Sequence, residues 1–179
     1  MYIFSQVLVG ISDLLYVGSM LNKKKLGLVL FLFFSDVLYA SHLLVLGALT
    51  GSIIIFIDAA FLLVTYFLEK FNKQKYVKYA VIVTCVATIV TTIFTWGGAI
   101  SLLPMFSMLV YLFGMVFNNV VFVKGGSLLR NLLNIIYLIL ITSYVGAILE
   151  FGLMVSAIVG IIINIKKKDK EKEITKTAE

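Results

Sequence analysis

The sequence predicts an all-α membrane protein whose chain crosses the bilayer seven times. Of its 179 residues, 61% are hydrophobic and only 13% are charged, and the mean hydropathy is +1.09. A soluble domain of this size would not expose so much apolar surface. The apolar residues also gather into runs of about 20, which is the length of a helix that crosses the hydrocarbon core.

Seven apolar runs follow one another, separated by charged or glycine-containing breaks. The first run has no basic segment before it and no small-residue cleavage pattern after it, so we expect a retained helix and not a signal peptide. The fourth and sixth runs are the shortest. The predicted spans are residues 2–21, 26–46, 48–68, 79–96, 100–119, 127–144 and 145–165.

The basic residues predict the topology. All 15 lysines and arginines follow the first, third or fifth span or lie in the tail, and Lys124 and Arg130 form the group after the fifth. The other three connections carry no charge. By the positive-inside rule the N-terminus is then outside and the C-terminus in the cytoplasm. Six or eight spans would put basic loops on both sides.

The same distribution explains the net charge of +6. Basic loops beside apolar spans indicate contact with a lipid bilayer and not with nucleic acid. Residues 166–179 are too polar to fold alone, and we expect a disordered basic tail that touches anionic headgroups in the cytoplasm. Residues 1–165 form a single transmembrane domain.

An internal repeat is predicted within this domain. When the chain is shifted against itself by 95 residues, Tyr16 aligns with Tyr111 and Asp36 with Asn131, with no gap across three spans. Chance matches are common in so apolar a chain, so the alignment alone leaves the repeat open.

The predicted topology supports the repeat independently. Residues 1–68 and 99–165 each form a three-helix unit with the same direction, and the helix at 79–97 is the linker that inverts the chain. Two parallel units joined in this way are a known transporter plan.

Five ionisable side chains lie inside the predicted spans. A charge at the bilayer centre costs about 3 kcal/mol on insertion scales, so these groups should face the bundle interior, form pairs or take up protons. They are Asp13, Asp36, His42, Asp58 and Glu150.

Three of these acids are predicted to share one depth. Counted from the basic boundaries at about 1.5 Å per residue, Asp13, Asp36 and Asp58 all lie roughly 15 Å from the cytoplasmic edge, near the midplane. One interpretation is a site for a cation or a shared proton, which adjacent carboxylates favour. The other is a set of interhelical hydrogen bonds that only fix the packing.

His42 and Glu150 are predicted to share a second layer, nearer the outer surface. An imidazole and a carboxylate at one depth could form a charge-assisted pair or a proton relay near the outer mouth. The alternative is that each residue reaches water at a helix end.

Pro104, the only proline, lies early in the fifth predicted span. A proline frees a backbone carbonyl and permits a kink. The kink would be a gating hinge in one interpretation and a tolerated helix bend in the other.

Motifs for catalysis or metal binding are missing from the sequence. We find no G-x-S-x-G, no Walker A and no H-E-x-x-H, and the single histidine limits acid–base catalysis. Cys85 stands alone, so neither a disulfide nor a cysteine-ligated metal is expected. We therefore expect no enzyme activity, no cofactor and no metal.

Three short segments carry a family pattern: HLLVLGALTGS at 42–52, SLLPMFSMLV at 101–110 and VGAILEFGLMVSA at 145–157. Together they resemble the YgjV family of bacterial inner membrane proteins. The resemblance implies that four residues occupy family motif positions. It also implies similarity to the parallel-repeat plan of the SWEET, PQ-loop and PnuC-type transporters. The motif residues are His42, Gly47, Pro104 and Glu150.

The chain also departs from these families. YgjV members tend to carry an arginine about where Phe61 stands, and Asp58 takes a position that is usually small or uncharged. The PQ-loop signature is missing, because Met105 follows Pro104. Because of these departures, the resemblance to these families leaves the substrate of this chain open.

The leading functional prediction is a small-molecule transporter or facilitator that works by alternating access between the two three-helix units. The acids favour a cationic or proton-coupled substrate, while neutral sugars or vitamins stay open. The alternative is a membrane-embedded accessory or scaffold protein. The sequence leaves the oligomeric state open, and a homo-oligomer is one of the possibilities. A channel would need a continuous polar path, which the fourth span does not offer.

Overall fold

The computed structural model describes residues 2–45, 49–117, 119–140 and 144–177, with the backbone alone at 2–6, 144–145 and 167–177. Within these residues the chain forms seven α-helices, two short 3-10 turns and no strand, which confirms the all-α class. The helices are α1 (Tyr2–Leu21), α2 (Lys25–Val45), α3 (Leu49–Lys70), α4 (Val77–Phe94), α5 (Leu102–Val116), α6 (Val120–Leu140) and α7 (Tyr144–Thr177). The 3-10 turns η1 (Gln74–Tyr76) and η2 (Ala99–Ser101) precede α4 and α5.

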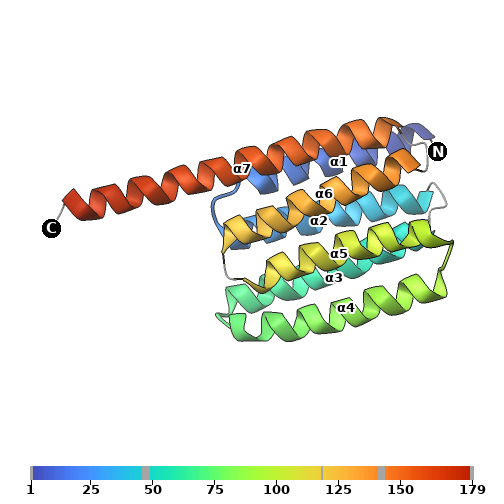
Figure 1. The fold of residues 1–179 in the computed structure, drawn as a ribbon, viewed down its shortest axis with the longest axis horizontal. Helices are drawn as coiled ribbons and strands as arrows, with labels where there is room; N and C mark the ends of the chain where they lie inside the picture. The colour runs from blue at the N-terminus through green and yellow to red at the C-terminus, as the bar shows by residue number, and fades with distance from the viewer. Residues whose placement is uncertain (1, 46–48, 118, 141–143, 178–179) are drawn as a thin grey trace.

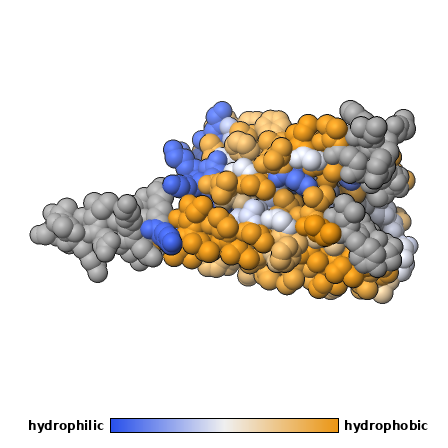
Figure 2. Space-filling model, turned by 90° about the horizontal axis from the view of Figure 1, so that it is seen from above, coloured by the Kyte–Doolittle hydropathy of each residue, from blue (hydrophilic) through white to orange (hydrophobic). Residues whose placement is uncertain are grey.

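Six of the described helical segments are long and apolar enough to cross a membrane, and the part of α1 whose side chains are described, Val7–Leu21, is apolar but shorter. Large apolar side chains face outward from the bundle; Phe94, for example, is 85% exposed. On the face that Figure 2 shows, hydrophobic residues predominate among the coloured atoms of the bundle, while hydrophilic ones gather mainly at the end where α7 leaves it. Such a surface suits a lipid environment, in which outward apolar side chains need no protein cover.

The seven helices run lengthwise, and each runs opposite to the one before it (Figure 1). The two chain ends therefore lie at opposite ends of the bundle. α1, α2 and α3 form one layer and α5, α6 and α7 form another in front of it, while α4 closes one edge between α3 and α5. α1 and α7 meet at the other edge. The middle helix of each layer, α2 or α6, contacts both of its neighbours.

One half of the bundle is tightly packed between the layers. Its fully buried side chains include Met20, Leu28, Leu112 and Met115, which belong to a single apolar cluster. Glycines allow the backbones to approach closely here: a Cβ on Gly114 would lie 2.8 Å from the Phe122 carbonyl oxygen. Small residues at helix contacts serve this purpose in membrane proteins.

The sixth span begins seven residues earlier than predicted. α6 starts at Val120, so Lys124 lies within a helix and not in a cytoplasmic loop, in the same helix as Arg130, and both side chains are buried. The helix holds both charges because each has a partner on another helix. Lys124 Nζ donates to the carbonyl oxygen of Gly160 at 3.1 Å and to Asn164 Oδ1 at 3.2 Å.

The C-terminal tail also differs from its prediction. Where the sequence predicts disorder from residue 166, α7 continues as a helix to Thr177. Elongating a helix that already exists is far easier than nucleating one, so a polar segment can extend an apolar helix. The predicted connection around Gly47 and residues 141–143, near the end of the predicted sixth span, lie outside the described residues.

Candidate functional site

A cavity of about 810 Å³ lies between the two layers. Much of its lining comes from helix termini at the side of the bundle opposite the C-terminus. Thr50 lies in the first turn of α3, Gly97 follows the end of α4, and Gly146 lies in the first turn of α7. Its deep part is lined by Arg130 and Glu150. The cavity therefore leads from one end of the bundle to charged groups near the middle of the helices.

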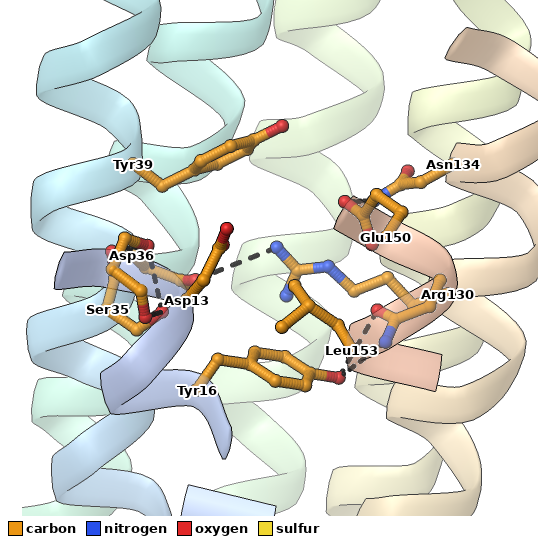
Figure 3. Close-up of a pocket in the computed structure, with 11 residues that line it drawn as sticks. Asp13, Tyr16, Ser35, Asp36, Tyr39, Arg130, Asn134, Glu150 and Leu153 are labelled. Carbon is orange, nitrogen blue, oxygen red and sulfur yellow. Dashed lines mark hydrogen bonds and ion pairs between the residues drawn. The ribbon is translucent and has the colours of Figure 1, made fainter. Parts of the chain in front are cut away.

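A pocket of about 30 Å³, with room for about one water molecule, continues the cavity at its base. Both spaces are lined by Asp13, Tyr39, Arg130 and Glu150. Figure 3 shows Arg130 projecting across this pocket toward the side that carries Asp13 and Asp36. The base of the cavity is thus a charged floor built from both layers.

Arg130 forms the centre of this floor. Its Nη1 donates a hydrogen bond to Asp58 Oδ2, and its Nη2 lies 3.8 Å from Asp36 Oδ1. The guanidinium also stacks over Tyr111, with its central carbon 5.1 Å from the ring centroid. One cation thus faces two carboxylates, and the cluster is a buried ion network that ties α6 to α2 and α3.

A second polar link lies beside this cluster. The Tyr16 hydroxyl donates to Asn131 Oδ1 at 3.2 Å, and Asn131 Nδ2 approaches the Tyr16 hydroxyl oxygen at 2.9 Å. This contact joins α1 to α6. Tyr16 and Tyr111, which the 95-residue shift aligns, are both buried between the layers.

Glu150 on α7 is held from one side only. Asn134 Nδ2 donates to Glu150 Oε1 at 3.2 Å, and Ser107 in turn donates to Asn134 Oδ1 at 2.9 Å. The Glu150 side chain is only 7% exposed, yet its Oε2 accepts no hydrogen bond from any described residue. The cavity wall therefore contains a buried carboxylate oxygen that is open to a donor.

His42 and Asp13 line the large cavity from α2 and α1. The His42 ring stacks on Tyr39 with ring centroids 6.0 Å apart, and Asp13 is half-buried. The proposed pairing of His42 with Glu150 stays a prediction, although both residues line the same cavity.

Pro104 lines the cavity from the first turn of α5, three residues after the N-cap Ser101. An N–H at that position has no acceptor within an α-helix, so the proline removes no helical hydrogen bond there. Its role as a hinge stays a prediction. Gly47, the other motif position, lies outside the described residues.

The structure brings residues of the two predicted acidic layers to one pocket. Asp36 and Asp58 meet through Arg130, and Asp13 and Asp36 line the small pocket together with Glu150, which we expected in a separate outer layer. From the sequence we did not single out Arg130, because we counted it with the basic group after the fifth span, although the predicted sixth span, residues 127–144, includes it. The signal that points to it is electrostatic: intramembrane acids require a cation.

The fold and this cavity define a class, that of multi-pass α-helical membrane proteins with a charged internal cavity. A family model, Imp-YgjV, described as a bacterial inner membrane protein, matches residues 3–168. The chain therefore belongs to the YgjV family and is a multi-pass protein of the bacterial inner membrane. Comparison with curated proteins and with solved structures gives no match.

Proposed function

We propose that this protein is a small-molecule transporter or facilitator that works by alternating access. The observation that carries the proposal is the one-sided cavity: it leads from one end of the bundle to a charged floor, and the other half is closed. Met20, Leu112 and Met115 are fully buried in that closed half. A cavity of this kind corresponds to one of the two end states that alternating access requires.

The arrangement of helices supports a movement of two units. α1 to α3 and α5 to α7 run in the same sequence of directions and pack in the same order, with α4 between them (Figure 1). This is consistent with the parallel repeat that the 95-residue shift suggests. The units touch at α1 and α7 and through the Arg130 cluster, so rocking them apart would open the closed half.

The charges favour a cationic or proton-coupled substrate. Four carboxylates surround the floor and its small pocket, with Arg130 as the one cation among the pocket-lining residues. Carboxylates at membrane depth attract protons or cationic groups. The carboxylates are Asp13, Asp36, Asp58 and Glu150.

Single-cysteine accessibility tests the proposal without knowledge of the substrate. In a Cys85→Ser background, Ser101→Cys places a thiol in the cavity, and Met115→Cys places one in the closed half. A membrane-impermeant thiol reagent is added to right-side-out and inside-out vesicles. If the protein is a transporter, the reagent should label Ser101→Cys from the outer side. It should label Met115→Cys from the inner side in a fraction of the molecules.

Phe113→Cys is the matched control on the same helix, because Phe113 is 67% exposed on the outer surface of the bundle, where lipid would cover it. It should react from neither side. If Met115→Cys is also inert from both sides, the closed half never opens and alternating access is wrong. The alternative scaffold function predicts that inert result, together with stoichiometric co-purification of another membrane protein.

A further inference from the structure

We infer that the cavity binds an organic ammonium ion and that Glu150, not the acids paired with Arg130, is its counter-charge. This inference gives a substrate class to the proposed transport function and rests on that function for its biological role. The binding itself depends only on the cavity and its side chains.

The ion pairs of the floor divide the acids into two groups. Asp58 is fully buried, lines neither the cavity nor the pocket and accepts a hydrogen bond from Arg130 Nη1; Asp36 Oδ1 lies 3.8 Å from Nη2 of the same guanidinium. Glu150 and Asp13 line the cavity and form no ion pair within 4 Å among the described residues. A ligand that enters therefore meets two carboxylates that form no ion pair with a described residue, beside an Arg130 that already faces Asp58 and Asp36.

The geometry of Glu150 points to a donor from the ligand. Asn134 fixes one carboxylate oxygen, and Ser107 fixes Asn134, so the side chain is held in place before a ligand arrives. The other oxygen, Oε2, is buried without a described partner; Asp36 Oδ2 and Asp58 Oδ1 are in the same state, but of these three carboxylates only Glu150 lines the large cavity. A buried acceptor without a donor costs free energy, and an ammonium N–H that reaches it recovers that cost.

The size and walls of the cavity favour an organic cation over a metal ion. A volume of about 810 Å³ suits a small organic molecule and far exceeds that of a bare ion. Tyr39 and Tyr137 contribute aromatic rings to the walls, and aromatic faces attract cations. Among the described residues, no three His, Cys, Asp or Glu side chains come together as metal ligands.

The test uses three probes of similar shape and different charge: benzylammonium, benzyl alcohol and benzoate. Each is titrated into the purified full-length protein in detergent, and binding is measured by calorimetry and by the shift in Tm. We expect benzylammonium to bind at least about tenfold more tightly than the other two, because only it supplies a cationic donor.

Glu150→Gln keeps the shape of the side chain and removes its charge. We expect this variant to lose at least about tenfold in benzylammonium affinity. Glu173→Gln, the same change in the polar end of α7, should bind as the unaltered protein does. The charge series in the unaltered protein tests the inference even if Glu150→Gln does not fold.

Three results overturn the inference: no binding of benzylammonium, equal or tighter binding of benzyl alcohol or benzoate, or full affinity in Glu150→Gln. The cysteine experiment separates this failure from failure of the proposed function. Selective ammonium binding with an inert Met115→Cys supports the site and contradicts transport. Accessible Met115→Cys without ammonium selectivity supports transport and overturns the substrate class.

Discussion

Arg130 on α6 donates a hydrogen bond to Asp58 on α3, across 72 positions of the chain and between the two helix layers. Both side chains are removed from the surface, with Asp58 fully buried and Arg130 9% exposed. Asp36 completes the cluster at a longer distance of 3.8 Å. The pair therefore links the two units that the proposed transport cycle would move.

Removing one partner of this pair should destabilise the protein. Asp58→Asn leaves a buried guanidinium without its nearest counter-charge, and we expect a loss of about 3 kcal/mol in the free energy of unfolding. Asp36→Asn should cost clearly less, because at 3.8 Å that carboxylate is beyond hydrogen-bond distance of Arg130. Unfolding by SDS in mixed micelles measures both variants, and equal losses would contradict the assigned geometry.

The two aligned tyrosines should respond differently to loss of the hydroxyl. Tyr16→Phe leaves the buried Asn131 amide without its partner and should cost about 1–3 kcal/mol of unfolding free energy. The Tyr111 hydroxyl is buried without a hydrogen-bond partner among the described residues, so Tyr111→Phe should be neutral or stabilising. The same unfolding measurement compares the two, and a larger loss in Tyr111→Phe would show that its hydroxyl is engaged.

Two glycines on α7 should give effects of opposite sign. A Cβ on Gly160 would collide with the Met20 backbone carbonyl of α1, so Gly160→Ala should force the helices apart and cost about 1–3 kcal/mol. Gly152 has no atom within 4 Å of such a Cβ, so Gly152→Ala should stabilise the helix by up to about 1 kcal/mol. Thermal unfolding in detergent measures both, and destabilisation by Gly152→Ala would mean that this face has a partner.

The orientation in the membrane is a separate prediction. Lys23 to Lys25, the η1 connection and the end of α7 lie at the same end of the bundle, which the positive-inside rule places in the cytoplasm (Figure 1). A C-terminal fusion to green fluorescent protein should therefore fluoresce. Alkaline phosphatase inserted between α4 and α5 should be active, because that connection lies at the opposite end. Phosphatase activity at the C-terminus would reverse the assignment.

The positions of most helices follow from the sequence because their causes are local. Apolar length defines a span, and flanking charges mark where it ends, so α1 matches its prediction and α2 and α3 begin and end within two residues of theirs. The start of α6 was misplaced because Lys124 resembles a loop residue until its partners on α7 are known. The helical tail was not predicted because the composition of residues 166–179, taken alone, does not show that they follow an apolar helix. Extending that helix is easier than forming a new one.

The sequence by itself determined that this is an all-α membrane protein and placed Asp13, Asp36 and Asp58 near the middle of their helices. Those results depend on hydropathy and on rise per residue, which act along one dimension. Only the tertiary structure decided that Arg130 pairs with Asp58 and Asp36 and that Glu150 lines the same pocket as Asp13. Such contacts depend on how each helix is rotated and which helix faces it, because side chains at equal depth meet only when packing turns them toward one another.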